Sequence, residues 1–167
     1  CKKETFVMNF FEAENISAGY KDKEVLRSLS FSSEENTIVG IIGANGSGKS
    51  TQAELLKIRL KEMGYETFSL DLPYYSDSSS ALVKMYLAGE MGTNPSDVNA
   101  FAASTFFAVD RYASFVRHWK KEYESDKSVI ILNRYTTSNA VHQLAKISDD
   151  NEKKAFLEWL YDYELVK

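Results

Sequence analysis

The stretch Gly43-Ala44-Asn45-Gly46-Ser47-Gly48-Lys49-Ser50 decides the fold, because it matches the phosphate-binding pattern G-x-x-x-x-G-K-[ST]. It follows an apolar run at residues 37–42 and precedes apolar residues at helical spacing over 49–63, the strand, loop and helix context that the pattern requires. In such a loop, backbone amides and the positive end of the following helix hold phosphate groups. A glycine-rich turn that only joins a strand to a helix is the structural alternative.

Within this loop we expect Lys49 to reach the β- and γ-phosphates of ATP and Ser50 to bind Mg²⁺. Lys49 is therefore also a candidate catalytic residue, because it neutralises the phosphates. The residues expected to bind the ATP phosphates are Gly43, Asn45, Gly46, Ser47, Gly48, Lys49, Ser50 and Thr51.

Composition narrows the class of protein. The 167 residues are 44% hydrophobic and 26% charged, which predicts one globular domain and excludes a disordered or collagen-like chain. One Cys and two His exclude an internal disulfide and a Cys/His zinc site. No apolar run is long enough to cross a membrane, so the cytoplasm is the expected location. The net charge of −4 argues against nucleic acid as a partner.

Periodicity predicts an α/β fold of three layers, of the P-loop NTPase type. Its core is a parallel sheet with strands at about 38–42, 66–71 and 128–132, and runs at 5–11, 14–20 and 24–32 form an antiparallel N-terminal meander. The chain is expected to be a single domain, in which residues 1–36 extend a core at 37–167. Helices are predicted at 49–63, 79–90, 96–123, 138–146 and 152–166, and the longest of these is expected to be broken or bent.

Residues 47–167 resemble thymidylate kinases of the nucleoside-monophosphate kinase class. The resemblance is carried by Gly48-Lys49-Ser50-Thr51-Gln52, residues 78–87, Phe107-Ala108-Val109-Asp110-Arg111-Tyr112 and Asn133-Arg134-Tyr135-Thr136-Thr137-Ser138. It implies that Phe107 stacks on thymine, Arg111 hydrogen-bonds the base, and Arg134 holds the acceptor phosphate as a second catalytic residue. It also implies that Ser138 belongs to the substrate site.

The residues themselves support these roles in part. Phe107 and Arg111 are four apart, so one helical face presents both an aromatic ring and a cation. Arg134 follows a buried parallel strand, at the end where open α/β sheets bind ligands. A core position for Phe107 and a carboxylate partner for Arg111 remain the structural alternatives.

Residues 12–51 resemble a different family, the ABC-transporter ATPase domains. Residues 13–20, 25–31 and 38–46 follow its first strands and loop, and Tyr20 stands where its adenine-stacking aromatic residue lies. Nothing downstream resembles that family's Leu-Ser-Gly-Gly-Gln signature. We therefore expect a hybrid sequence joined near residues 46–51.

Several departures from the thymidylate kinase pattern bear on catalysis. Asn45 and Asn133 stand where that family has Asp, and residues 71–75 lack a phosphate-binding Arg. Family members continue past Lys167 into an arginine-bearing lid. The expectation is a C-terminally truncated chain that binds better than it catalyses.

Together these patterns predict transfer of the ATP γ-phosphoryl group to a deoxynucleoside monophosphate, dTMP to give dTDP, with Mg²⁺. The alternatives are an ABC-transporter ATP-binding subunit, which would have a membrane partner, and an ATP-binding fragment without transferase activity. The expected partners are ATP and dTMP, and the resemblance implies a homodimer. The kinase hypothesis also predicts the strand order: strand 127–132 lies directly beside strand 38–42, and strand 66–71 lies on the other side of strand 127–132.

Overall fold

The computed structural model describes residues 11–20, 23–33, 48–125 and 128–165. Its backbone falls into two compact units, Cys1–Lys49 and Ser50–Lys167, and each is described by itself. The predicted strand at 38–42 and loop residues 43–47 lie outside the described residues. The position of that strand in the sheet therefore stays a prediction.

The first unit contains an antiparallel hairpin of β1 (Phe11–Tyr20) and β2 (Lys23–Ser33). Its register shifts at several points, and Asn15 and Ser28 have positive φ angles of 50° and 45°, as expected where bulges interrupt a ladder. The hairpin pairs the predicted strands 14–20 and 24–32. Of the predicted strand 5–11, only Phe11 is described, and it belongs to β1, so what is observed is a hairpin of two strands.

Helix α1 (Lys49–Glu62) begins at the lysine of the phosphate-loop pattern. Gly64, at φ 90°, follows the helix in the left-handed conformation that glycine adopts at little cost. The predicted helix and its glycine stop are confirmed.

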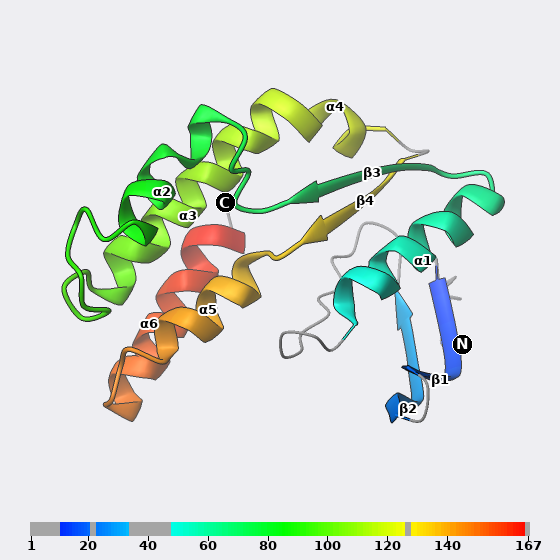
Figure 1. Cartoon of the computed structure of the whole chain (residues 1–167), viewed down its shortest axis with the longest axis horizontal. Helices are drawn as coiled ribbons and strands as arrows, with labels where there is room; N and C mark the ends of the chain where they lie inside the picture. Colours follow the sequence, from blue (N-terminus) through cyan, green and yellow to red (C-terminus); the bar gives the residue numbers. More distant parts are fainter. Residues whose placement is uncertain (1–10, 21–22, 34–47, 126–127, 166–167) are drawn as a thin grey trace, which may run out of the picture. The chain divides into compact units, whose positions relative to one another are not determined.

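A parallel pair of strands forms the described part of the predicted sheet. Strand β3 (Glu66–Asp71) pairs with β4 (Ser128–Asn133) from Glu66 opposite Ser128 to Asp71 opposite Asn133. Both strands run toward the helices, so their carboxyl ends meet at one edge (Figure 1). Leu70, Leu72 and Trp119 are buried against this pair. The segments that follow Asp71 and Asn133 therefore begin side by side, at the carboxyl edge of the strand pair.

The helices of the second unit follow the predicted order. A short 3₁₀ turn, η1 (Ser78–Ser80), leads into α2 (Ala81–Leu87), and α3 (Ala100–Ser114) continues through a π-helical segment, η2 (Phe115–Trp119), into α4 (Lys120–Tyr123). The predicted break in the long helix at 96–123 is thus confirmed, because η2 interrupts it. The last two helices are α5 (Thr136–Leu144) and α6 (Asp150–Leu165).

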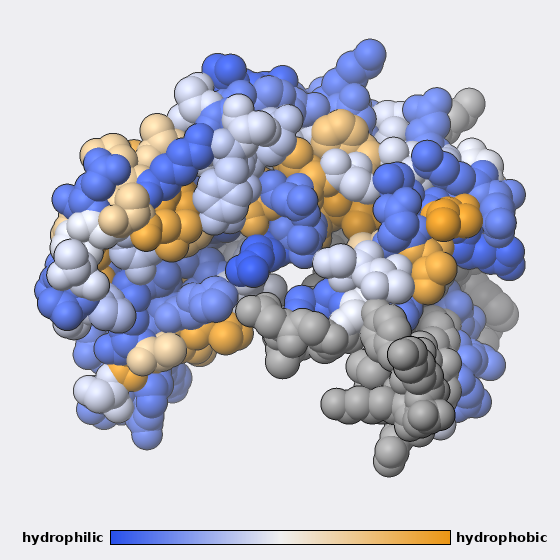
Figure 2. Space-filling view, viewed as in Figure 1, coloured by the Kyte–Doolittle hydropathy of each residue, from blue (hydrophilic) through white to orange (hydrophobic). Residues whose placement is uncertain are grey.

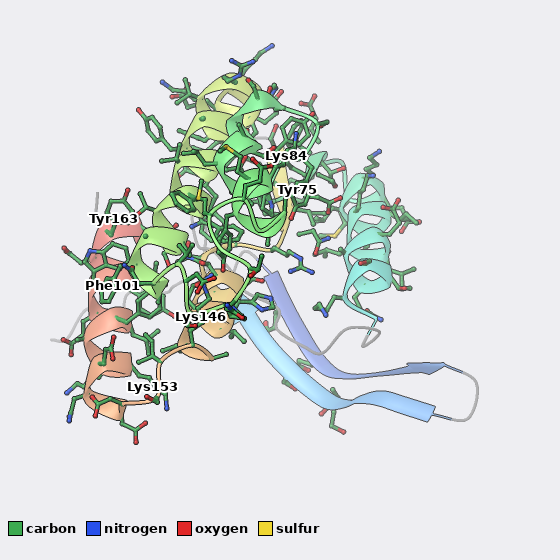
Figure 3. All side chains as sticks on the ribbon, turned by 60° about the vertical axis from the view of Figure 1, so that its left-hand side comes forward. Tyr75, Lys84, Phe101, Lys146, Lys153 and Tyr163 are labelled. Atoms are coloured by element: carbon green, nitrogen blue, oxygen red, sulfur yellow. The ribbon has the colours of Figure 1, made fainter. Side chains whose placement is uncertain are left out.

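A core cluster joins α3, α5 and α6. Phe156 and Leu160 are fully buried, and the small side chains of Ala100 and Ala140 are buried beside them. Phe101 meets Trp159 edge-on at 4.9 Å, and Trp159 stacks on Tyr163 at 5.2 Å, so aromatic rings line the seam between α3 and α6 (Figure 3). This packing holds α3, α5 and α6 together.

The surface of the second unit is largely hydrophilic, with hydrophobic side chains exposed over α2 and α3 (Figure 2). Leu82, Met85, Leu87 and Val109 are all more than a third exposed. Among the described helices, none combines the length and the apolar character that crossing a membrane requires.

Asp77 caps the 3₁₀ turn η1 and connects it to the π-helical segment η2. Its carboxylate accepts hydrogen bonds from the Ser79 backbone N–H at 2.8 Å and from Arg117 at 3.3 Å, and it lies 2.7 Å from Nε2 of His118. The Ser79 N–H bond and then the His118 contact lower the pKa of Asp77 to about 2.

We predict that Asp77→Asn lowers the melting temperature at pH 6, because the amide lacks the charge that these donors stabilise. A depressed pKa stabilises the fold above the unfolded pKa of 3.8, and this contribution is lost as the pH falls through about 2. The difference between wild type and variant should therefore shrink between pH 4 and pH 2. A melting-temperature difference that is constant over this range would contradict the assignment.

Candidate functional site

A pocket of about 340 Å³ opens where the carboxyl ends of β3 and β4 meet α2, α3 and α5. This volume lies within the range of about 300–1,000 Å³ that is usual for small-molecule sites. The lining residues are Leu72, Pro73, Tyr75, Tyr86, Leu87, Phe107, Asp110, Arg111, Arg134, Tyr135, Ser138, Asn139, His142, Gln143 and Lys146.

The four residues predicted for the substrate site all line this one pocket. Phe107 and Arg111 come from α3, Arg134 follows β4, and Ser138 lies in the first turn of α5. They are separated by up to thirty-one positions in the sequence, so the fold is what brings them together. Their roles remain predictions, whereas their proximity is observed.

The predicted phosphate-loop residues are described only in part. Gly48 has a φ of 86°, which favours glycine, and Lys49, Ser50 and Thr51 follow it in the first turn of α1. Residues 43–47 lie outside the described residues. The phosphate-binding role of the whole loop stays a prediction.

Arg111 forms a buried ion pair with Glu164. Its Nε donates to the carboxylate at 2.7 Å, and Nη2 donates to the other carboxylate oxygen, so the pair is bidentate. The two side chains are only 9% and 5% exposed. The carboxylate partner that the sequence left open for Arg111 is thus present, and the arginine still lines the pocket.

Tyr135 lies beside this ion pair. The guanidinium carbon of Arg111 is 5.7 Å from the centre of the Tyr135 ring, a cation-π distance. Burial raises the pKa of the Tyr135 phenol above its usual value, and the neighbouring Arg111 opposes that rise. Tyr135 therefore stays neutral near pH 7 and presents an aromatic face to the guanidinium.

Arg134 has a different environment. It is exposed and has a φ of 69°, the left-handed conformation that a non-glycine residue rarely adopts. It pairs with no carboxylate among the residues that the structure describes. The strained backbone turns the chain directly after β4, and the positive charge is available to an anion.

Lys146 makes contacts beside Phe107 in the lining of the pocket. Nζ of Lys146 donates to the Tyr86 hydroxyl at 2.6 Å and to the Val98 carbonyl at 3.2 Å, and it lies 4.8 Å from the centre of the Tyr86 ring. Tyr86 in turn meets Phe107 edge-on at 6.2 Å. Lys146 thus holds an aromatic ring against the ring predicted to stack on a base.

Two buried amides in the pocket were not predicted from the sequence. Asn139 is 5% exposed and Gln143 is 2% exposed. Both amide atoms of Asn139 and the Gln143 oxygen have no hydrogen-bond partner among the described residues. Buried polar atoms without partners are costly, and in a pocket they point to a ligand. Their spacing of four along α5 was the signal available in the sequence.

Buried carboxylate contacts connect the segment after β3 to α3. Asp110, which is fully buried, accepts hydrogen bonds from the Tyr74 backbone N–H at 3.1 Å and the Ser79 hydroxyl at 2.8 Å. At the edge of the sheet, Asn133 donates to Asp71 at 2.7 Å. The sequence drew attention to Asn133 as the loss of a carboxylate, but Asp71 supplies one directly opposite.

The chain matches the family model described as thymidylate kinase over residues 41–162. It therefore belongs to the thymidylate kinase family. It is 32% identical to a probable thymidylate kinase of Thermococcus gammatolerans over 126 residues. The aligned region covers 74% of this chain and 57% of that protein.

A probable thymidylate kinase of Pyrococcus horikoshii is also 32% identical, over 109 residues, which is 65% of this chain and 52% of that protein. The chain thus spans about half the length of these relatives. A shorter similarity, 46% over 44 residues, links 26% of the chain to 18% of the ABC-type transporter ATP-binding protein EcsA of Bacillus subtilis. Both resemblances predicted from the sequence are confirmed.

We predict that Lys146→Met destabilises the fold by about 1–2 kcal/mol, because Tyr86 and Val98 lose a charged hydrogen-bond donor. Urea unfolding measures the change. Lys153→Met is the matched control, since Lys153 pairs with the exposed Asp150. Equal stability of the Lys146→Met variant and the wild type would show that the Lys146 contacts contribute nothing.

Proposed function

We propose that this chain transfers the γ-phosphoryl group of ATP to a deoxynucleoside monophosphate, converting dTMP to dTDP. The observation that carries the proposal is the contrast between two arginines in one pocket. Arg111 is neutralised by Glu164, whereas Arg134 has no described carboxylate partner. A nucleoside monophosphate has the matching contrast, a neutral base at one end and an anionic phosphate at the other.

The base belongs at the Arg111 end of the pocket. The Phe107 ring offers a stacking surface, and an aromatic base gains both buried area and ring contact there. The unpartnered amides of Asn139 and Gln143 offer donors and acceptors to the edge of a pyrimidine. Asn and Gln amides suit a ring that presents both carbonyl and N–H groups, as thymine does.

The acceptor phosphate belongs at the Arg134 end. Arg134 follows β4 at the carboxyl edge of a parallel strand pair, which is the edge where open α/β sheets bind ligands. A guanidinium binds a phosphate through two parallel hydrogen bonds. In the proposed complex Ser138, from the first turn of α5, adds a hydroxyl donor to the same site.

On the donor side, Lys49 neutralises the ATP phosphates and residues 43–51 enclose them. The hydroxyl of Ser50, in the first turn of α1, is exposed and fits a Mg²⁺ site in which one hydroxyl joins phosphate oxygens and water. No cluster of three or more acidic, His or Cys residues suited to a metal occurs in the part of the chain that is described. When bound, Mg²⁺ would neutralise part of the negative charge of the phosphates.

In the proposed reaction an oxygen of the dTMP phosphate attacks the γ-phosphorus of ATP. The bond from that phosphorus to the β,γ-bridging oxygen breaks, and ADP leaves with the bond's electron pair. The chain's own contribution is to orient the acceptor with Arg134 and to stabilise the transferred charge with Lys49. These two residues are the proposed catalytic residues.

The proposal includes the rest of the predicted architecture. A P-loop fold of three layers requires strand 38–42 beside β4, with β3 outside it, within one domain. The exposed hydrophobic residues on α2 and α3 (Figure 2) supply a surface for the proposed homodimer. Size measurement in solution tests the dimer separately from activity.

The direct test of the function is release of ADP from MgATP with and without dTMP, measured by a coupled assay. We expect ADP release to depend on dTMP and dTDP to form in equal amount. Binding of both nucleotides without dTDP formation would instead support the alternative of an ATP-binding protein that transfers nothing.

We predict that Arg134→Met raises the KM for dTMP by about 10- to 100-fold, because a charged hydrogen bond to phosphate contributes about 1.5–3 kcal/mol. Its affinity for ATP should not change. Arg117→Met is the matched control, since Arg117 is 57% exposed and does not line the pocket. An unchanged KM for dTMP in Arg134→Met would remove Arg134 from the phosphate site.

We predict that Lys49→Ala weakens ATP binding at least about tenfold, because the phosphates lose a charged partner. Isothermal titration calorimetry measures the affinity. Lys61→Ala is the control, because Lys61 is exposed in the last turn of the same helix, α1. An equal affinity for ATP in wild type and Lys49→Ala would contradict the phosphate-loop assignment.

A second function has one observation in its favour, the short similarity to ABC-type ATP-binding proteins. It predicts ATP hydrolysis that is independent of dTMP. The same assay therefore separates the two functions.

A further inference from the structure

Glu164 is placed to control how Arg111 faces the pocket. It lies in the last turn of α6, fifty-three positions after Arg111. One carboxylate oxygen accepts hydrogen bonds from Arg111 Nε at 2.7 Å and from the Thr136 hydroxyl at 3.0 Å, while the other accepts from Arg111 Nη2. Three helices thus meet at one buried carboxylate.

This arrangement leaves Arg111 with one free edge. Nε and Nη2 are both committed to Glu164, and Nη1 donates to no other residue in the described part of the chain. A bidentate pair fixes the plane of the guanidinium, and the Tyr135 ring lies against it at 5.7 Å. The guanidinium of Arg111, a residue that lines the pocket, is therefore held in a single orientation, which leaves the Nη1 donors for a ligand.

The ion pair also changes what Arg111 attracts. An unpaired guanidinium in a pocket is a site for anions, as at Arg134, whereas a paired one is electrically balanced and serves as a hydrogen-bond donor. Both arginines line the same pocket, and of the two only Arg111 has a carboxylate partner among the described residues. The difference in charge between the Arg111 end and the Arg134 end of the pocket therefore depends on Glu164.

We propose that Glu164 is a positioning residue that determines base specificity through Arg111. Held by Glu164, Nη1 of Arg111 offers donors alone, which suit the carbonyl at the 4-position of thymine and oppose the amino group that cytosine carries there. Glu164 itself touches no substrate. This inference rests on the proposed function, because it assumes that a pyrimidine monophosphate occupies the pocket.

The test compares Glu164→Gln with the wild type by calorimetry, using dTMP, dCMP and ATP as the probes. The variant should bind dTMP about 10- to 100-fold more weakly, the cost of a lost charged hydrogen bond. The ratio of dTMP to dCMP affinity should fall by a similar factor, and ATP affinity should stay unchanged. A general loss of packing would weaken both monophosphates alike and leave their ratio unchanged.

Glu158→Gln is the matched control, because it makes the same change on the same helix at an exposed residue, 70% exposed, paired with Lys154. It should match the wild type for all three nucleotides. A folded Glu164→Gln variant that keeps the wild-type preference for dTMP over dCMP overturns the proposal.

A second variant keeps the test decisive if Glu164→Gln does not fold. Replacing both partners, Arg111→Met with Glu164→Met, leaves no unpaired buried charge, and such paired replacements are often tolerated. This variant should fold and should lose the preference for dTMP. A folded double variant that retains the preference overturns the proposal.

The outcomes also separate this inference from the proposed function. If the wild type binds dTMP and forms dTDP but Glu164→Gln keeps the base preference, only the role of Glu164 fails. If the wild type binds neither pyrimidine monophosphate, the proposed function fails, and the inference fails with it.

Discussion

The contact among helices α3, α5 and α6 depends on the free-energy cost of burying the charge of Arg111. A guanidinium removed from water needs a carboxylate and good hydrogen-bond geometry, and the contact between Arg111 and Glu164 supplies both. Glu164 stands near the end of α6, and that helix also packs against α3 and α5 through Phe156 and Leu160. Thr136, only 1% exposed, adds the contact to α5. The aromatic seam of Phe101, Trp159 and Tyr163 follows the same line of approach.

The residues that follow the carboxyl ends of β3 and β4 line the other part of the pocket, and they include Leu72 and Arg134. The register that places Asp71 opposite Asn133 brings two distant segments, the one after β3 and the one that carries Arg134, to the same edge. The segment after β3 is then fastened to α3 by Asp110, which accepts hydrogen bonds from Tyr74 and Ser79. Asn133, which stands where the family has Asp, faces and donates to the carboxylate of Asp71 on the neighbouring strand. Departures from a family motif are thus better judged across strands than along one strand.

Much of the fold was predictable because it depends on local pattern. Strand β3 and the glycine stop at Gly64 were predicted to the residue, and the break in the long helix was expected from its length. The site was predicted as four separate residues, and each prediction depended on a motif or on helical spacing. Asn139 and Gln143 were missed because their spacing of four shows only that they share a helical face, and not that this face is buried and leaves their amides without partners. Of the three strands predicted for the antiparallel N-terminal segment, the two that fall within the described residues pair as a hairpin, and the strand at 5–11 stays a prediction.

The sequence by itself determined the periodicity of each element, the family of the chain and the residue types available for chemistry, since these depend on neighbours within a few positions. Only the tertiary structure decided what each charge does. Arg111 and Arg134 are both arginines in family motifs, and the sequence left a carboxylate partner for Arg111 open without naming one. The fold buries Arg111 against Glu164, fifty-three positions away, and leaves Arg134 exposed at the end of β4. The physical reason is that electrostatic environment depends on distance in space and on burial, and both arise only when α6 packs against α3.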